Sequence, residues 1–293
     1  MWNCSFFSCK SPANQELETR KRRWAVRKLL RTFAGLLVVA FATTVARADV
    51  TLWIDDSAGN IGTVDLTTQT VTVIGNAGVV LTDIAFSPSG NLYGNSFTNL
   101  YSVSTTTGVA TNIGATGVTD LNALVFGSNG TLYSAGAAPD TNLYTLNPST
   151  GAATSLGSIG VSSAGDLAFH NGTLYLADTN GNLDSINLSP LSATVIGAFG
   201  SAFDASTYGL ANGSNNVLYG IAGTEVFSVN TSTGVGTAVF NYGGHGLGDA
   251  NGAAVLTEAG FTPVPEPSTF VIAGLGALGF MVYTCRRRKQ IAG

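Results

Sequence analysis

The chain has 293 residues, with 13 Lys and Arg against 17 Asp and Glu, and its cations are confined to its two ends. No Lys or Arg occurs from Asp49 to Thr284, whereas fifteen of the carboxylates do. Nucleic-acid affinity depends on Lys and Arg that neutralise phosphates, so the composition excludes nucleic-acid binding by this central region. Its lack of cysteine also excludes a disulfide or a Cys-based zinc site there.

Residues 1–48 predict an export signal. A basic segment at 20–31 precedes an apolar segment at 32–43 and an A-x-A cleavage pattern. The apolar segment is shorter than the roughly 20 residues that a spanning helix needs, although an uncleaved anchor is the alternative. The predicted cleavage site comprises Ala46, Ala48 and Asp49.

Residues 49–260 contain a repeated unit of strand, Thr/Gly turn and strand. In the copy at 99–114, NLYSVSTTTGVATNIG, two apolar-alternating segments flank the turn. Copies begin about 41 residues apart, and self-similarity at such a period indicates an array of small sheets. The five copies occupy residues 60–75, 99–114, 142–157, 182–197 and 225–240.

A second strand pair precedes each later copy. Residues 81–94, LTDIAFSPSGNLYG, show the pattern of an apolar strand, a tight turn and a strand with an aromatic residue. One repeat is therefore four short antiparallel strands, as in a β-propeller blade. The chain starts part-way through a blade, so residues 247–251 are expected to close the ring against the N-terminal strands. We predict an all-β propeller of about five blades; a six-bladed ring and a β-solenoid are the alternatives.

These repeats resemble the propeller-like repeats of secreted bacterial surface proteins. The resemblance rests on the LYG…LYxIN…TGxxTxIG style of repeat across residues 50–258. It implies a fold and does not identify an activity.

The C-terminal region changes composition at about residue 261. A Pro-rich linker at 261–269 is followed by an uncharged segment at 270–284 and a basic tail at 285–293. An apolar helix that ends in cations predicts a transmembrane helix with a cytoplasmic basic end. The basic residues are Arg286, Arg287, Arg288 and Lys289.

The three C-terminal parts, in this order, resemble the PEP-CTERM sorting signal of Gram-negative bacteria. The resemblance implies recognition by an exosortase, removal of the tail, and release or transfer of the body to the cell surface or matrix. An ordinary C-terminal anchor is the alternative. The sorting motif comprises Val264, Pro265, Glu266, Pro267 and Ser268.

Catalytic residue sets are scarce in this chain. It has only two histidines, His170 and His245, and both are expected to lie in loops. There is no GxSxG motif, and the central region has no Lys to act as a base or a Schiff-base residue. We therefore expect no enzyme activity and no resident cofactor.

Calcium is the one cation for which the sequence offers a candidate loop. Residues 178–184, DTNGNLD, place oxygen side chains at alternate positions, as at the start of an EF-hand loop. The loop departs from that pattern, because its Gly falls too early, Leu183 stands where the pattern has Gly, and no Glu closes the loop. Asp and Asn also favour plain hairpin turns. The candidate ligands are Asp178, Asn180, Asn182 and Asp184.

Four further acids occupy related inner-strand positions, and the predicted ring gathers such positions around its central mouth. There they would hold a cation, or each would bond neighbouring backbone amides, which is the favoured interpretation. The four are Asp83, Asp120, Asp166 and Asp249.

Together these features predict an exported protein, first anchored in the inner membrane and then at the cell surface or outside the cell. Its expected role is non-enzymatic, as a binding or structural component of the envelope, exopolysaccharide or biofilm matrix. Expected partners are the export machinery, the exosortase, and extracellular polysaccharide or surface proteins. One alternative is a propeller hydrolase or lyase with a metal at the mouth. Another is a carbohydrate-binding lectin, which would need Tyr93 and its equivalents to be exposed.

Overall fold

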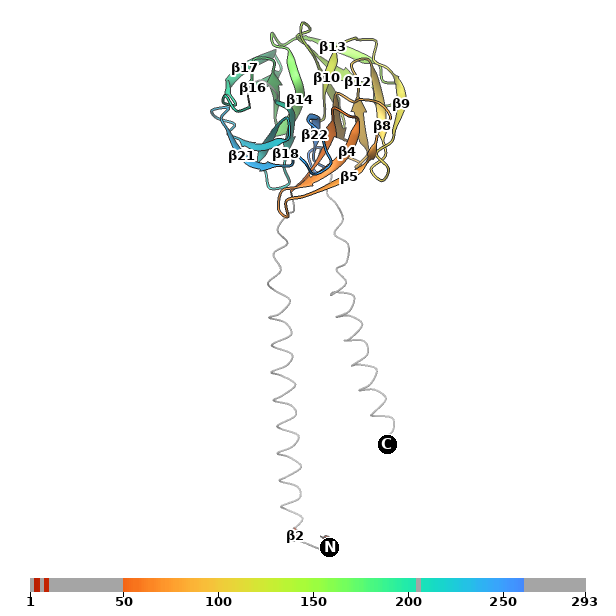
Figure 1. Cartoon of the computed structure of the whole chain (residues 1–293), viewed down its shortest axis with the longest axis vertical. Helices are drawn as coiled ribbons and strands as arrows, with labels where there is room; N and C mark the ends of the chain where they lie inside the picture. Colours follow the sequence, from red (N-terminus) through yellow and green to blue (C-terminus); the bar gives the residue numbers. More distant parts are fainter. Residues whose placement is uncertain (1–2, 6–7, 11–49, 204–206, 261–293) are drawn as a thin grey trace. The chain divides into compact units, whose positions relative to one another are not determined.

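The structure is a computed structural model, and it describes residues 3–5, 8–10, 50–203 and 207–260. Twenty strands form five four-stranded antiparallel sheets, arranged as blades around a central axis (Figure 1). This confirms the predicted five-bladed all-β propeller and rules out the six-bladed ring and the solenoid. No helix long and apolar enough to cross a membrane occurs within these residues.

Each blade runs from an inner strand at the axis to an outer edge strand. The first blade contains β22 (Ala250–Ala254), β3 (Thr51–Asp56), β4 (Asn60–Asp65) and β5 (Thr70–Asn76). The second contains β6 (Asp83–Phe86), β7 (Leu92–Asn95), β8 (Asn99–Val103) and β9 (Ala110–Ala115), and the third β10 (Leu121–Phe126), β11 (Leu132–Gly136), β12 (Asn142–Leu146) and β13 (Ala153–Ser158). The fourth contains β14 (Ser163–His170), β15 (Thr173–Asp178), β16 (Asn182–Leu188) and β17 (Leu191–Ala198), and the fifth β18 (Thr207–Asn212), β19 (Leu218–Ala222), β20 (Glu225–Val229) and β21 (Gly236–Asn241).

The ring is closed by strands from the two ends of the repeat region. β22 supplies the inner strand of the first blade and pairs antiparallel with β3, with Ala253 opposite Ile54. In Figure 1 this last strand, in blue, lies beside the first sheet, in orange. Closure therefore occurs as predicted, but the strand begins at Ala250 rather than at residue 247. It removes the sheet edges that an open array would expose.

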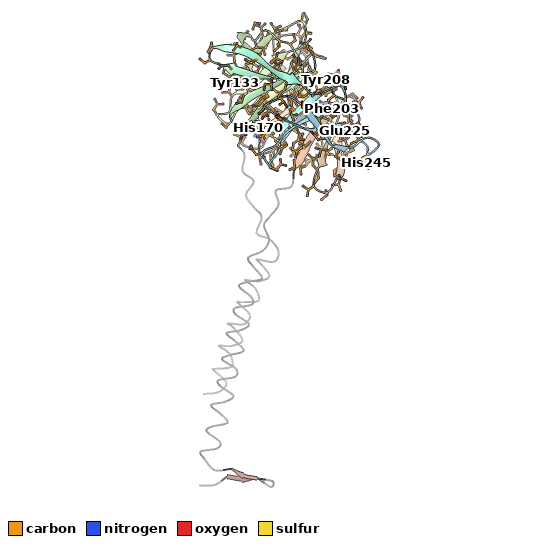
Figure 2. The ribbon with its side chains drawn as sticks, turned by 90° about the vertical axis from the view of Figure 1, so that its left-hand side faces the viewer. Tyr133, His170, Phe203, Tyr208, Glu225 and His245 are labelled. Carbon is orange, nitrogen blue, oxygen red and sulfur yellow. The ribbon has the colours of Figure 1, made fainter. Side chains whose placement is uncertain are left out.

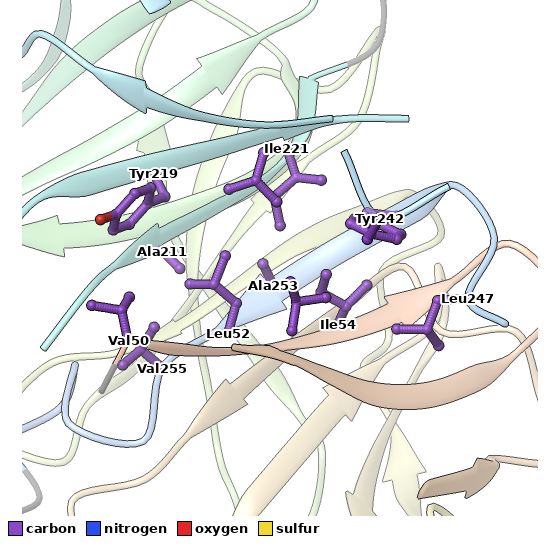
Figure 3. Packing of buried hydrophobic residues seen from close by; sticks show 13 residues of the cluster. Val50, Leu52, Ile54, Ala211, Tyr219, Ile221, Tyr242, Leu247, Ala253 and Val255 are labelled. Carbon is purple, nitrogen blue, oxygen red and sulfur yellow. The ribbon is translucent and has the colours of Figure 1, made fainter. Parts of the chain in front are cut away.

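The hydrophobic core consists of five clusters, one between each pair of neighbouring blades. Figure 3 shows the cluster at the closing junction, where Leu52 and Ile54 of β3 face Ile221 of β19. All three side chains are fully buried. The first and last blades are thus joined both by strand pairing and by apolar packing.

The repeated aromatic residues belong to these clusters. Trp53 packs on Phe86 of the next blade with ring centroids 5.3 Å apart. Tyr93 on Phe126 and Tyr133 on Phe169 repeat this contact at 5.2 and 5.7 Å. The lectin hypothesis required these aromatics to be exposed, so they cannot serve as its binding surface.

Two glycines of the repeated unit meet where neighbouring blades touch. Gly108, in the Thr-Gly turn of the second blade, has φ of 73°, and a Cβ there would lie 2.8 Å from the carbonyl carbon of Gly75 in the first blade. The close approach of the two backbones requires glycine. The same contact recurs between Gly114 and Gly151 and between Gly197 and Gly234.

The N-terminal residues form a separate unit, Met1–Ala48. Within it β1 (Asn3–Ser5) pairs antiparallel with β2 (Ser8–Lys10). The predicted signal segments, the cleavage site, the linker, the C-terminal helix and the basic tail all lie outside the described residues.

Candidate functional site

Two carboxylates meet at the centre of the ring. Strand pairing identifies one equivalent position in each of the five inner strands, which we call the axial position. It directly precedes the inner-strand residue that pairs with the second strand of its blade at Gly94, Ser134, Leu176, Gly220 or Ile54. Two of its occupants are Asp83 and Asp166, and the others are small. A Cβ on Gly252 would collide with the Asp83 carboxyl, so small residues leave the space that the acids fill. The five occupants are Asp83, Ala123, Asp166, Gly209 and Gly252.

These two acids accept hydrogen bonds from one backbone amide of every blade. Asp83 accepts from the amide N–H of its own neighbour Ile84 at 2.7 Å and from that of Leu124 at 2.5 Å. Asp166 accepts from three amides, those of Leu167 at 2.6 Å, Leu210 at 2.6 Å and Ala253 at 3.1 Å. The expectation that mouth carboxylates bond backbone amides is confirmed for this pair.

The other two acids expected at the mouth lie elsewhere. Asp120 is exposed and its carboxylate accepts a hydrogen bond from the Thr119 hydroxyl at 2.8 Å. Asp249 is exposed as well. The structure therefore brings together Asp83 and Asp166 but not the full set of four.

The buried acids at the axis and beside it have raised pKa values, because burial disfavours their charged forms and the region has no Lys or Arg. Burial and the adjacent Asp166 carboxyl raise the pKa of Asp83 well above its usual range. Burial raises the pKa of Asp55 to about 7, and neither of its oxygens has a partner among the described residues. Burial and Asp166 also raise the pKa of Glu258, which accepts a hydrogen bond from the Phe169 amide at 3.2 Å. Burial without a neighbouring Lys or Arg therefore favours the protonated forms of these acids.

A pocket of about 620 Å³ opens where the inner strands begin. This size is typical of small-molecule sites. Residues of all five blades line it, and three side chains there cross to the next blade in succession. These hydrogen bonds run from Asn251 Nδ2 to the Leu81 carbonyl at 2.9 Å, from Thr82 Oγ1 to the Leu121 carbonyl at 3.2 Å, and from Asn122 Nδ2 to the Ser163 carbonyl at 3.1 Å.

The pocket combines hydroxyl and amide groups with exposed aromatic side chains. Phe97 is 51% exposed, and Tyr208, labelled in Figure 2, is 39% exposed. Asn122 and Ser163 are almost fully buried, yet Asn122 Oδ1 and Ser163 Oγ have no partner among the described residues. Among the described residues that line the pocket, Asp178 is the one acidic residue.

Asp178 caps a hairpin turn with both of its carboxylate oxygens. Oδ1 accepts from the backbone amides of Asn180 and Asn182 at 2.9 and 2.8 Å. Oδ2 accepts from the side-chain amides of the same residues at 3.2 and 3.1 Å. Asp56 in the first blade bonds Asn60 in the same way. Three of the four candidate calcium ligands are thus arranged as a turn cap.

Asp184, the fourth candidate ligand, is fully buried, and neither carboxyl oxygen has a partner among the described residues. Burial and the nearby Asp178 raise its pKa to about 7. In the described part of the chain, no group of three or more His, Cys, Asp or Glu side chains is placed to hold a metal ion. Calcium at this loop stays a prediction.

The two histidines lie in different parts of the ring. His170 ends β14 and is buried, with Nδ1 2.9 Å from Asn212 Oδ1. The expectation of a loop position was wrong for His170, because it pairs with Thr173 in the blade and its side chain contacts Asn212 of the neighbouring blade. His245 is exposed in the loop after β21, near the ring of Phe240.

Sequence reasoning missed Asp55, Glu258, Asn122 and Ser163. None of these belongs to a motif, and their positions become related only when the inner strands are aligned around the axis.

Two family models match the chain, one within the repeat region and one in the C-terminal region. Residues 263–289 match the PEP-CTERM protein-sorting motif, and residues 115–242 match a repeat of unknown function, DUF6923. The chain therefore carries a PEP-CTERM sorting motif behind a repeat domain. No curated protein sequence matches it.

Several solved structures are similar to the chain at low identity. One is a protein of unknown function from Bacteroides thetaiotaomicron, with 15% identity, a TM-score of 0.48, and coverage of 66% of this chain and 55% of that one. Virginiamycin B lyase from Staphylococcus aureus has 14% identity, a TM-score of 0.42, and coverage of 65% and 66%. A chain of a nidogen/laminin complex has 12% identity, a TM-score of 0.47, and coverage of 71% and 85%. The match spans less than two thirds of the first two of these chains, and likeness this distant identifies no activity.

Proposed function

We propose that this chain is an exported precursor whose propeller acts, after processing, as a non-enzymatic binding or structural component of the cell surface or extracellular matrix. The sorting motif at 263–289 is the observation that carries the proposal, because it implies export and an anchored precursor. Residues 270–284 would hold that precursor in the membrane, with Arg286–Lys289 on the cytoplasmic side. An exosortase would then remove the tail.

The body of the chain supports a binding or structural role. Its pocket presents hydroxyl, amide and aromatic groups, and the carboxylates of Asp83 and Asp166 accept hydrogen bonds from backbone amides. A metal-dependent hydrolase or lyase would need His245 and several acids in one coordination shell. Among the described residues no such group occurs.

The processing step is tested by replacing Pro265, Glu266 and Pro267 with alanine in the full-length chain. The variant should stay at full length in the membrane fraction, whereas the wild type should appear as a shorter species at the surface or in the medium. Thr262→Ala, in the same linker, is the control and should mature normally. Maturation of the triple variant at the wild-type rate would sink the proposal.

A further inference from the structure

We infer that, in the anchored precursor, the propeller lies with one end of its ring against the lipid bilayer and turns the other end, with the pocket of about 620 Å³, outward. The inference rests on the proposed function, because it concerns the exported precursor that residues 270–284 would hold in the membrane. We call the end of the ring where the inner strands begin the upper face, and the end where they finish the lower face. The lower face consists of residues 255–260 and nine hairpin turns, at 66–69, 87–91, 104–109, 127–131, 147–152, 171–172, 189–190, 213–217 and 230–235.

The described repeat region begins and ends at this lower face. The carbonyl of Val50, before β3, accepts a hydrogen bond from the amide of Leu66 in a lower turn at 2.9 Å. At the other end, residues 255–260 follow β22. A Cβ on Gly260 would lie 3.7 Å from Cβ of Ser128, in the lower turn between β10 and β11. The C-terminal linker therefore starts from the lower face, and an uncleaved leader would join the same face.

Residues 255–260 are packed into the body, so the linker starts at a fixed point. Val255 belongs to the core cluster between the first and fifth blades, and Leu256 packs against the cluster between the first and second. Ala259 belongs to the cluster between the second and third blades. The Glu258 carboxyl accepts a hydrogen bond from an amide of the fourth blade at 3.2 Å. The segment thus contacts elements of all five blades.

The linker is too short for the propeller to turn its upper face to the membrane. Nine residues, 261–269, separate Gly260 from the apolar segment, and they span at most about 32 Å. A compact body of about 210 residues has a radius of gyration of about 17 Å, which corresponds to a sphere about 43 Å across. A chain that starts on the lower face would have to follow about 70 Å of such a surface to reach the opposite end. The lower face therefore stays toward the bilayer.

The two faces also differ in charge. The nine lower turns contain no Asp, Glu, Lys, Arg or His and consist largely of Thr, Ser, Asn and Gly. Two acids adjoin these turns, Asp65 at the end of β4 and Glu258, and burial raises the pKa of Glu258 well above its usual range. The upper loops and the strand ends beside them carry more acids that are exposed or half-buried, namely Asp120, Asp140, Glu225 and Asp249.

This difference in charge favours the same orientation on an anionic lipid surface. Blade strands of four to eight residues separate the two faces by roughly 13–27 Å. The Debye length at physiological ionic strength is about 8 Å, so the upper acids are screened from a bilayer at the lower face. Contact of the upper face with anionic lipids would be repulsive, and no Lys or Arg between Asp49 and Thr284 offsets this repulsion.

The test measures how close matched positions on the two faces lie to lipid head groups. The full-length chain, with its three cysteines replaced by serine, is reconstituted into vesicles of phosphatidylethanolamine and phosphatidylglycerol that contain a lipid with a nitroxide on its head group. A fluorophore is attached in turn to Val109→Cys and Val235→Cys on the lower face and to Val80→Cys and Phe97→Cys on the upper face. The four native side chains are 50–52% exposed, so the labels should leave the core intact.

The nitroxide should quench the lower labels at least about threefold more strongly, because the strands hold the upper positions roughly 13–27 Å farther away. Equal quenching of upper and lower labels, or stronger quenching of the upper labels, would overturn the orientation. Exposed apolar side chains occur on both faces, so hydrophobicity alone would not produce the expected difference.

The role of charge is tested by one double variant on each face. Val109→Glu with Val235→Glu should reduce the quenching of a label at Leu188→Cys, also on the lower face, by at least about twofold at low salt and by less at high salt. Val80→Glu with Phe97→Glu is the matched control on the upper face and should leave this quenching unchanged. Equal loss with both pairs would overturn the charge argument.

Flotation of the same vesicles separates this inference from the proposed function. A chain that does not float with the vesicles would contradict the anchored precursor, and with it the orientation. A chain that floats but shows equal quenching on both faces would contradict the orientation alone. Tail processing is measured independently on the Pro265–Pro267 variant.

Discussion

Gly220 and Phe227 lie opposite each other on β19 and β20, and the phenyl ring occupies the space that a side chain at Gly220 would need. The same cross-strand position pairs a small residue with a large one in most blades. In the second blade Gly94 faces Tyr101, and in the first the order is reversed, with Ile54 opposite Gly62. The volume of the pair is conserved while its members change, as expected for close packing between blades.

Gly220→Ala should therefore destabilise the propeller. A Cβ at this position would lie 2.6 Å from Phe227 Cε2, and overpacking of a core costs about 1–3 kcal/mol. Urea unfolding, followed by tryptophan fluorescence, measures the change. Gly248→Ala is the control, because a Cβ there has its nearest neighbour at an ordinary 3.4 Å. Equal midpoints for the two variants would contradict the packing argument.

Gln69→Gly, in the turn between β4 and β5, should stabilise the first blade. Gln69 has φ of 56°, in the left-handed region that the equivalent turn residues Gly108, Gly151 and Gly234 occupy without strain. Relief of this strain, less the extra entropy of an unfolded glycine, should contribute about 0.5 kcal/mol. The reciprocal variant Gly108→Gln should lose more, because the backbone of Gly75 blocks a side chain there. Differential scanning calorimetry measures the thermal midpoints of both variants. A midpoint for Gln69→Gly below that of the wild type would refute the assignment of strain.

The stability of the propeller should fall as pH rises from about 4 to 7. Burial raises the pKa of both Asp55 and Asp184 to about 7, so the folded state holds protons that the unfolded state releases near pH 4. The contribution of such a group to the free energy of unfolding is complete below pH 4. It is lost as the pH rises toward 7, at about 1.4 kcal/mol per pH unit for each group.

Urea midpoints between pH 4 and 8 at constant ionic strength test this dependence. Asp184→Asn should flatten the slope, because an amide does not titrate. Asp120→Asn, at an exposed position, is the control and should leave the slope unchanged. A midpoint that rises between pH 5 and pH 7 in the wild type would rule out the proposed proton uptake.

Millimolar calcium should leave the thermal midpoint of the wild type unchanged. Asp178 already accepts four hydrogen bonds from Asn180 and Asn182, and a cation would have to displace them. Thermal scans with calcium and with a chelator measure the effect. A calcium-dependent rise in the wild type that is absent from Asp184→Asn would establish the loop as a calcium site.

The sequence by itself determined the architecture of this protein. Repeats of about 41 residues, each with strand-period alternation and glycine turns, specify blades because the pattern is local to each repeat. The offset between the first and last copies also predicted that the ends would pair. The C-terminal motif needed no structure, since its three parts are contiguous in the chain.

The tertiary structure alone decided which polar groups meet. Asp83 and Asp166 belong to different blades, and they become neighbours only when the ring closes around one axis. Asn122 and Ser163 are likewise joined across a blade junction. The carboxyl of Asp184 is excluded from solvent for a similar reason. It occupies the position that carries Tyr144 or Phe227 in other blades, and the side chain at this position is buried. The repeat pattern placed Asp83 and Asp166 among four acids expected at the mouth, but which of the four meet depends on blade number and curvature, and no local sequence pattern encodes these.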